Sequence, residues 1–354
     1  MESLKRHRTG IVGLAITAIL LLVVFFGRRE IALVFNTVLQ VRKDWLFAAF
    51  LIQFAVYLSF AAVYWRSLAL LGHRVKLMSM YGIAFVAIFL GRIFPAGGTS
   101  TYAFLLYQLR RRGVPDGTGA ITVTLDGLSY YATFFSLLLV GFVYLFTQGQ
   151  LRVNQVLFIV LIVLGIIFLV MYIWALHYDR PLLTRRALAL KNRVARLLHR
   201  SWGDTSVLAF IAEVYDGMAL VKRNRSGFLQ LVGLQLVALL LDSLTILLLF
   251  RSLDVSPHFS IVLLGYCLAN FFSAVTSLPG GGGSFEAAMT LTFTQLELRS
   301  EIAISVTLLY RLLAFWIPLF VAGIVYQYIQ KGPSEPASHR HVRLSASGSE
   351  GGSR

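Results

Sequence analysis

The sequence predicts an all-α polytopic membrane protein with about six spanning helices and two oppositely oriented re-entrant helical hairpins. Hydrophobic residues make up 57% of the 354 residues and charged residues only 14%, against roughly 45–50% and about 25% in soluble domains. The hydrophobic residues also form long runs, since 45–65 and 153–176 contain no Asp, Glu, Lys or Arg. About 20 apolar residues cross a bilayer, so several such runs predict a multi-pass protein.

The hydrophobic runs define the candidate membrane segments. The first follows Lys5, Arg6 and Arg8, as in a secretory signal peptide, but Gly27-Arg28-Arg29-Glu30 provides no small-residue cleavage site. It is therefore predicted to be an uncleaved transmembrane helix. The candidate segments are residues 10–26, 45–65, 77–109, 119–147, 153–176, 227–250, 261–296 and 301–329.

Two of these segments are interrupted by a proline followed by glycines. Pro95-Ala96-Gly97-Gly98 divides 77–109, and Pro279 followed by Gly280 to Gly283 divides 261–296. Proline removes a backbone donor and glycine disfavours helix, so each helix should break at membrane depth, where protein or a watery cavity must surround the break. The arm 99–109 spans about 16 Å at 1.5 Å per residue, roughly half of a bilayer core. Each segment is therefore predicted to enter and leave on the same side.

The distribution of basic residues agrees with such hairpins. With a cytoplasmic N-terminus and a re-entrant 77–109, both Arg110-Arg111-Arg112 and the basic linker 177–226 face the cytoplasm, where Lys and Arg collect. The loop 27–44 is the exception, because it carries basic residues but is predicted to lie on the outer side of the membrane. The net charge of +16 thus indicates membrane topology rather than nucleic-acid binding. We expect a plasma (inner) membrane protein with cytoplasmic termini, and amphipathic linker helices against the headgroups.

The two interrupted segments also indicate an internal repeat. Residues 95–103 align without gaps with 279–287, and each break has one full span before it and one after it. The repeats 45–147 and 227–329 therefore have opposite predicted orientations, an arrangement that places a substrate site near the midplane, at broken helices. Residues 1–330 are expected to form one membrane domain, and 331–354, rich in Ser, Gly and Pro, a disordered tail.

Charges inside the predicted spans indicate where a site lies, because each costs about 2.5–3.5 kcal/mol at a helix centre and normally faces protein or water. Two interpretations remain open for Arg311. It forms an ion pair with Asp126 or Glu286, or it holds a lipid phosphate together with Arg92. Asp242 is expected to pair across helices rather than to be catalytic.

The glycine breaks have two interpretations as well. Their backbone amides, at 97–100 and 281–284, either bind an anion at a helix N-terminus or serve only tight packing. Metal-ligand, nucleophile and phosphate-loop motifs are not found in the sequence, so no catalytic residue, metal or cofactor is predicted. The candidate substrate-binding residues are Arg92, Pro95, Gly97, Gly98, Ser100, Tyr102, Asp126, Pro279, Gly281, Gly282, Ser284, Glu286, Tyr310 and Arg311.

Two motifs resemble a known family. The stretch 278–286, Leu-Pro-Gly-Gly-Gly-Gly-Ser-Phe-Glu, followed by Leu309-Tyr310-Arg311, is similar to the transmembrane region of lysylphosphatidylglycerol synthetase/flippase proteins, and 91–98 resembles an earlier motif of that region. The resemblance covers roughly 10–330. It implies movement of a modified phospholipid between leaflets, or a related lipid-handling role. It also implies that the core site positions are Pro279, Gly281, Gly282, Glu286, Tyr310 and Arg311.

The same resemblance bears on enzymatic activity. Lysyl-transferring members carry a large soluble catalytic domain after the membrane region, whereas only 331–354 follows here, so we do not expect lipid aminoacylation. The first hypothesis is a flippase-like transporter of a phospholipid or isoprenoid-linked lipid. The alternatives are a membrane-embedded enzyme or enzyme subunit acting on a lipid-linked substrate, and a scaffold that docks a lipid-modifying enzyme through the linker. A homo-oligomer is a further possible assembly.

Overall fold

The computed structural model describes residues 37–39, 41–93, 98–147, 224–276, 283–331 and 338–339. Apart from one pair of two-residue strands, the elements in these ranges are helices. The predicted spans 10–26 and 153–176, nearly all of the linker 177–226 and most of the tail 331–354 lie outside them. The elements are α2 Lys43–Leu70, β1 His73–Arg74, α3 Leu77–Ile93, α4 Gly98–Arg110, α5 Asp116–Thr147, α9 Arg225–Ser252, α10 Phe259–Thr276, α11 Ser284–Gln295, α12 Ser300–Arg311, the π-helix η2 Leu312–Trp316, α13 Ile317–Lys331 and β2 Ser338–His339.

Within the described residues, four helical stretches are long and apolar enough to cross a membrane. They are 26 to 30 residues long, which corresponds to roughly 40 Å at 1.5 Å per residue and exceeds a hydrocarbon core of about 30 Å. α3 and α10 are shorter apolar helices. The all-helical, multi-pass character predicted from the sequence is confirmed. The four stretches are Lys43–Leu70, Asp116–Gly141, Arg225–Ser252 and Ser300–Ile329.

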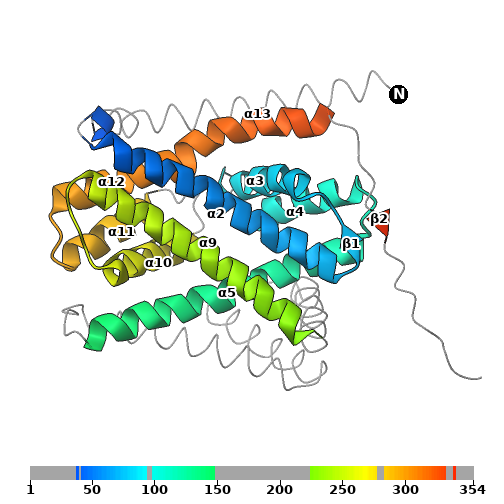
Figure 1. Cartoon of the computed structure of the whole chain (residues 1–354), viewed down its shortest axis with the longest axis horizontal. Coiled ribbons are helices and arrows are strands. Elements are labelled where there is room, and N and C mark those ends of the chain that lie inside the picture. The colour runs from blue at the N-terminus through cyan, green and yellow to red at the C-terminus, as the bar shows by residue number, and fades with distance from the viewer. Residues whose placement is uncertain are drawn as a thin grey trace, which may run out of the picture.

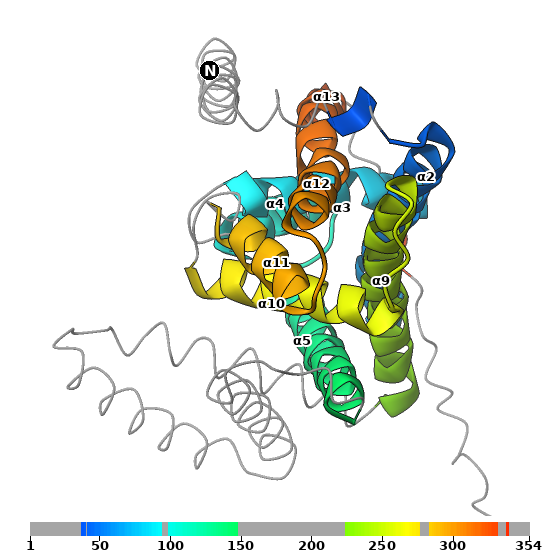
Figure 2. The same ribbon diagram turned by 90° about the vertical axis from the view of Figure 1, so that its left-hand side faces the viewer.

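Helices α2 and α9 lie side by side and form one face of the described molecule, in front in Figure 1 and at the right-hand edge in Figure 2. Ala49 of α2 and Ala238 of α9 are completely buried, and small side chains let two helix backbones approach closely within a bilayer, where apolar burial alone does not drive association. Other helices pack against this pair. α3 packs against α2 on one side, and α5 contacts both α2 and α9 on the other.

The two predicted interruptions are confirmed as places where one helix ends and another begins. α3 ends at Ile93 and α4 begins at Gly98, while α10 ends at Thr276 and α11 begins at Ser284. α3 packs against α4, and α10 packs against α11, so each pair forms a helical hairpin. With 13 and 12 residues, α4 and α11 are only about 18–20 Å long, too short to cross a bilayer core.

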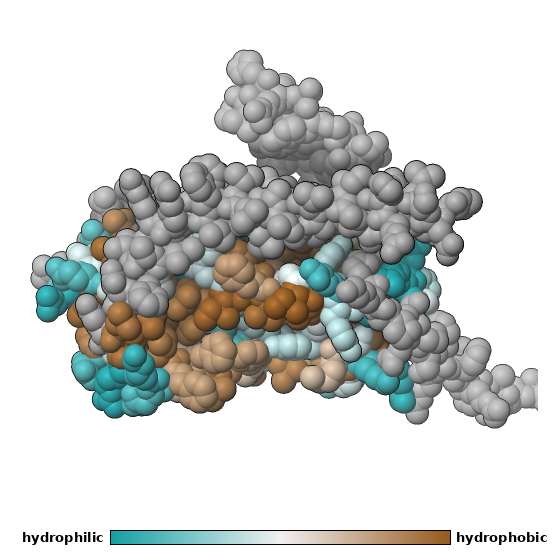
Figure 3. All heavy atoms as spheres, turned by 90° about the horizontal axis from the view of Figure 1, so that it is seen from above, coloured by the Kyte–Doolittle hydropathy of each residue, from teal (hydrophilic) through white to brown (hydrophobic). Residues whose placement is uncertain are grey.

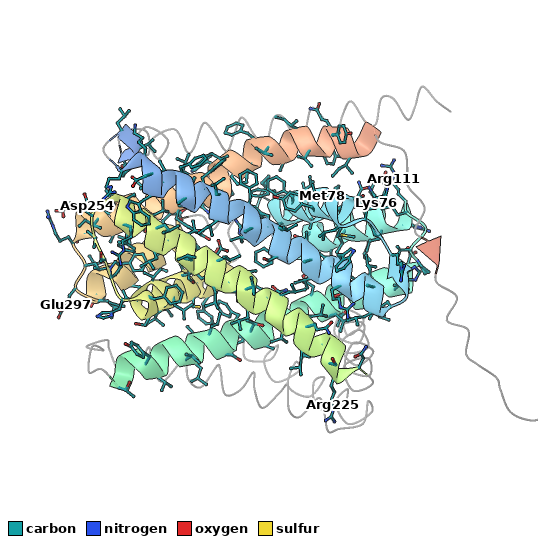
Figure 4. All side chains as sticks on the ribbon, in the orientation of Figure 1. Lys76, Met78, Arg111, Arg225, Asp254 and Glu297 are labelled. Atoms are coloured by element: carbon teal, nitrogen blue, oxygen red, sulfur yellow. The ribbon has the colours of Figure 1, made fainter. Side chains whose placement is uncertain are left out.

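The two hairpins open toward opposite ends of the molecule. Lys76 and Arg111, which flank α3 and α4, lie at the right-hand end of Figure 4, while Asp254 and Glu297, which flank α10 and α11, lie at the left-hand end. Figure 2, seen from that left-hand end, has α10, α11 and α12 in the foreground. Each chain segment therefore returns to the end from which it entered.

Left-handed residues stop the corresponding helices of the two halves. Gly72 (φ +84°) follows α2 and Asp254 (φ +58°) follows α9, while Gly113 (φ +75°) follows α4 and Glu297 (φ +67°) follows α11. The residue after Gly113, Val114, donates its amide to the carbonyl of Leu109 at 3.1 Å. The residue after Glu297, Leu298, likewise donates its amide to the carbonyl of Phe293 at 3.1 Å. Such bonds satisfy the carbonyls that a helix end leaves unpaired. Residues with positive φ thus follow the helices α2, α4, α9 and α11, while the repeat itself stays a prediction.

On the face seen in Figure 3, the part of the described surface that grey atoms do not cover is mostly hydrophobic in the middle and hydrophilic toward both ends of the long axis. Large apolar side chains are exposed along the helices, among them Leu229 of α9 at 67% and Ile324 of α13 at 71%. Such exposure suits contact with lipid tails, since bilayer-spanning proteins face hydrocarbon outward.

Candidate functional site

An ion pair joins the second hairpin to the helix that follows it. Glu286 lies in the first turn of α11, and its Oε1 contacts Nε of Arg311, the last residue of α12. The side chains of Glu286 and Arg311 are only 16% and 12% exposed. The guanidinium carbon lies 4.3 Å from the ring centre of Phe315 and 5.7 Å from that of Phe285, within the range of cation–π attraction. Of the two ion pairs considered from the sequence, the structure therefore contains the one between Glu286 and Arg311.

One carboxylate oxygen of this pair can still accept a hydrogen bond. Glu286 Oε2 is buried and has no hydrogen-bond partner among the described residues. A carboxylate has about four lone-pair positions, and an unmet buried acceptor costs about 1–3 kcal/mol. A donor that entered this region would therefore find an acceptor already in place.

The helix after Arg311 changes its winding. Ile317 donates its backbone amide to the carbonyl of Leu312, five residues earlier, so that Leu312–Trp316 form a turn of π-helix between α12 and α13. The cause lies in the sequence, because Pro318 has no amide hydrogen and leaves the carbonyl of Ala314 without its α-helical donor. π-turns inside α-helices occur frequently at functional sites.

Two side chains from the first half donate hydrogen bonds to the carbonyl of Ala314, which lacks its helical donor because of Pro318. Tyr57 of α2 donates its hydroxyl to Ala314 O at 3.1 Å, and Arg92, at the end of α3, donates Nη1 to the same oxygen. Arg92 is thereby held by a neutral acceptor rather than by a carboxylate. Its guanidinium also lies 5.7 Å from the ring centre of Phe89.

Asp242 is the most buried carboxylate of the region, with 1% of its surface exposed. It accepts hydrogen bonds from the hydroxyls of Tyr266 at 2.8 Å and Tyr310 at 3.0 Å, and from Nε2 of Gln53 at 3.3 Å. It also interacts electrostatically with Arg92. As expected, Asp242 pairs across helices, joining α9 to α2, α10 and α12. Tyr310 is consequently fixed to Asp242 and only 3% exposed.

Asp126 lies apart from Arg311 and has different partners. Its Oδ2 accepts from the hydroxyl of Tyr64 at 2.8 Å, and its Oδ1 accepts from Nε2 of Gln235 at 2.9 Å. The Asp126–Arg311 pair considered from the sequence is therefore not the arrangement in the structure. Tyr102, in the first turns of α4, lies nearby, since its hydroxyl is 3.8 Å from where a Cβ on Gly127 would be.

The serines that follow the two breaks tie the arms of each hairpin together. Ser100 donates its hydroxyl to the carbonyl of Leu90 at 3.1 Å, and the hydroxyls of Ser284 and Thr276 share a hydrogen bond of 2.8 Å. Gly98 is the first residue of α4. The remaining predicted site residues, Pro95, Gly97, Pro279, Gly281 and Gly282, lie outside the described residues.

The predicted residues thus gather into two groups. Arg92, Glu286, Tyr310 and Arg311 lie around the end of α12 and the π-turn, while Tyr102 and Asp126 lie between α4 and α5. Sequence reasoning missed the glutamines, Gln53 and Gln235, although both are polar residues in otherwise apolar spans. Pro318 was the available signal for the π-turn. Within the part of the chain that the structure describes, three or more His, Cys, Asp or Glu residues nowhere gather to hold a metal ion.

Comparisons with known proteins agree on one family. The model of the lysylphosphatidylglycerol synthase TM region matches residues 10–322. A UPF0104 membrane protein of Methanocaldococcus jannaschii is 22% identical over 305 residues, which cover 84% of this chain and 88% of that protein. A UPF0104 membrane protein of Methanothermobacter thermautotrophicus is 32% identical over 111 residues, 30% of this chain and 33% of that protein. This multi-pass membrane protein therefore belongs to the family of the lysylphosphatidylglycerol synthase transmembrane region.

Proposed function

We propose that this protein translocates a lipid or lipid-linked headgroup between the leaflets, through a midplane polar cavity between two re-entrant hairpins. The observation that carries the proposal is the largely buried Glu286–Arg311 pair, which lies at the N-terminus of a short helix and faces a π-turn in a spanning helix. Ionisable groups within spans characteristically line pathways for substrates or ions. The acyl tails of the substrate would remain in lipid while its headgroup passes these side chains.

The arrangement of the hairpins supports an alternating route. In an inverted repeat, one hairpin enters from each face of the membrane, and their broken helices meet near the midplane. Lys76, Arg111 and Arg225 lie at one end of the molecule, and Asp254 and Glu297 lie at the other (Figure 4). The positive-inside rule assigns the basic end to the cytoplasm. On this assignment α3 and α4 enter from inside and α10 and α11 from outside.

The two arginines give the site its preference for phosphate. A guanidinium binds phosphate oxygens in a bidentate manner and remains charged in any environment. Arg92 donates its hydrogen bond to a neutral carbonyl and interacts with Asp242 electrostatically, so a phosphate can replace the carbonyl as its hydrogen-bond acceptor. Arg311 already has Glu286 as its partner, and a phosphate must compete with that carboxylate. Arg92 is therefore the first contact and Arg311 the second.

Reconstituted protein tests the proposal. Proteoliposomes carry a phospholipid with a fluorescent tail, and a membrane-impermeant quencher measures how much of it reaches the inner leaflet. Arg311→Gln is expected to slow translocation by about tenfold or more, because a hydrogen bond to a charged group contributes about 1.5–3 kcal/mol and about 1.4 kcal/mol is tenfold in rate. Arg251→Gln, on the exposed end of α9, is the matched control. Equal rates for wild type and Arg311→Gln would remove the proposed role.

A membrane-embedded enzyme is the second candidate function, and the unpartnered Glu286 Oε2 is what favours it. A carboxylate with one available oxygen can act as an acid or base toward a lipid-linked substrate. The two functions differ in their products. Lipids extracted after incubation with purified protein have unchanged masses if the protein only translocates them, whereas new masses that disappear with Glu286→Gln indicate chemistry.

A further inference from the structure

We infer that Asp126 binds and releases a proton inside the membrane, and that this proton drives the proposed headgroup movement. The coupling rests on the proposed function, but the proton site itself does not. Asp126 lies in the middle of the spanning stretch Asp116–Gly141. Intramembrane carboxylates that serve transport are commonly proton carriers.

The charge balance around the three carboxylates singles out Asp126. Glu286 contacts Arg311 directly, and Asp242 interacts with Arg92. Both hydrogen bonds to Asp126 come from neutral groups, the hydroxyl of Tyr64 and the amide of Gln235. Among the described residues Asp126 thus has no cationic partner, and a carboxylate in that situation within a bilayer is strongly disfavoured in its charged form. Taking up one proton removes that penalty.

The surroundings of Asp126 contain other titratable groups, but these are phenols. Tyr64 comes from α2, Tyr102 from α4 and Tyr131 from the next turn of α5 itself. α9 contributes the neutral Gln235. α10 packs against a later part of α5, around Gly141, where its Cys267 lies near Tyr130. Phenols ionise near pH 10 and carboxylic acids several pH units lower, so Asp126 is the group of this set that is chemically suited to carry the proton.

Gln235 is able to bind both forms of Asp126. With the carboxylate charged, Gln235 Nε2 donates to Asp126 Oδ1 at 2.9 Å, while Gln235 Oε1 is buried and has no hydrogen-bond partner in the described part of the chain. When a hydronium ion gives its proton to Oδ1 and leaves as water, the acid needs an acceptor. A half-turn of the Gln235 amide brings Oε1 to that position. The proton thus reverses the direction of one hydrogen bond.

This reversal acts between the two halves of the protein. Asp126 belongs to α5 of the first half and Gln235 to α9 of the second. The other cross-half contact of this kind joins Gln53 of α2 to Asp242 of α9. Asp242, however, has two tyrosine donors and the nearby Arg92, all of which stabilise its charge. The contact at Asp126 has no such charged neighbour among the described residues, so a proton that binds there can favour one arrangement of the two halves over another.

Infrared spectroscopy of the purified full-length protein tests the proton site without any transport. The wild type should show the carbonyl band of a protonated carboxylic acid that appears as pH is lowered, and Asp126→Asn should lose it. Asp254→Asn, on an exposed turn, is the matched control and should keep it. A band that survives in Asp126→Asn, or a wild type without one, overturns the inference, as when a sodium ion holds the carboxylate charged.

A second variant and a transport measurement complete the test. If Asp126→Asn does not fold, Tyr64→Phe, which removes one donor and keeps the ring, must shift the pH midpoint of the band, and an unshifted midpoint overturns the proton site. In proteoliposomes, a pH gradient should speed lipid movement severalfold for wild type and leave Asp126→Asn unaffected. Movement that ignores the gradient overturns the coupling. If no lipid moves while the band behaves as expected, the proposed function fails and the proton site stands.

Discussion

The carboxylate of Glu286 and the guanidinium of Arg311 join the first turn of α11 to the last turn of α12. The first helix begins directly after a glycine-rich break, and the second continues into a π-turn. The pair therefore links the start of α11 to the π-turn. Both side chains are largely buried, so both the stability of the pair and its opening have measurable consequences.

Replacing one residue of the Glu286–Arg311 pair should lower stability more than expected from the effect of replacing both. Glu286→Gln or Arg311→Gln alone leaves one buried charge unpaired and is expected to lower the free energy of unfolding by about 3–5 kcal/mol. The double variant should cost less than the sum of the two. Denaturation in detergent, read as a double-mutant cycle, measures the difference. The exposed pair Arg299–Glu301 is the matched control and should show almost no coupling. Additive effects at Glu286 and Arg311 would mean that their contact is not energetically important.

The pair should also govern which headgroup is accepted. An anionic headgroup that binds Arg311 leaves the carboxylate of Glu286 without its cationic partner. A headgroup that carries both an amine and a phosphate provides a partner for both Glu286 and Arg311. Glu286→Gln removes this distinction. The ratio of phosphatidylglycerol to phosphatidylethanolamine translocated, measured with tail-labelled lipids, is expected to rise about tenfold, which corresponds to about 1.4 kcal/mol. Glu301→Gln should leave the ratio unchanged, and an unchanged ratio for Glu286→Gln contradicts the expectation.

Tyr57 should contribute stability through a single hydrogen bond. Tyr57→Phe keeps the ring, which packs against Phe85 with ring centres 5.0 Å apart, and removes the hydroxyl that reaches Ala314 O. Arg92 still satisfies that carbonyl, so the expected loss is about 0.5–1.5 kcal/mol in the free energy of unfolding. Tyr107→Phe, at an exposed position of α4, should change nothing. A loss of 3 kcal/mol or more, about the scale of a core truncation, would mean that Tyr57 does more than donate.

The second hairpin requires a glycine where α10 meets α11. A Cβ on Gly265 would lie 2.8 Å from Cζ of Phe293, a completely buried ring packed against Phe250. Gly265→Ala is therefore expected to destabilise the protein by about 1–3 kcal/mol, as overpacking does. Gly233→Ala in α9 meets nothing within 4 Å and should be neutral or stabilising by up to about 1 kcal/mol. Thermal unfolding of the two variants gives the comparison.

The orientation of the hairpins can be measured with single cysteines in a background where Cys267, buried between helices, is replaced by alanine. Cysteines at Lys76 and Arg110 should react with a membrane-impermeant reagent only from the cytoplasm. Cysteines at Asp254 and Glu297 should react only from outside. Labelling of Arg110→Cys from outside would show that residues 77–109 cross completely, and the proposed cavity would be lost with that result.

The sequence predicted the broken helices well because proline and glycine act locally. The ends of α3 and α10 follow from missing amides and unrestricted backbone near Pro95 and Pro279, whatever surrounds them. It indicated the intramembrane charges as well, because a charged residue within a long apolar run is visible in the sequence and is costly there unless protein or water surrounds it. The choice between Asp126 and Glu286 as the partner of Arg311 could not be predicted, because it depends on how α11 and α12 pack.

Other features lay beyond what sequence reasoning could establish. Gln53 and Gln235 are uncharged polar residues, and nothing in the sequence showed that each reaches a carboxylate. Pro318 was visible, but a proline inside a span is compatible with a kink, a break or a π-turn. Which of these occurs depends on donors such as Tyr57 and Arg92 arriving from the other half of the chain.

The π-turn at Leu312–Trp316 holds one more residue than an α-helical turn would. Deleting a single residue there should restore regular winding and leave every side chain of α13 on its present face. The same deletion further along α13 would rotate all later side chains by about 100°, because an α-helix has 3.6 residues per turn. This stretch is therefore the place where the last spanning helix can tolerate a change of length.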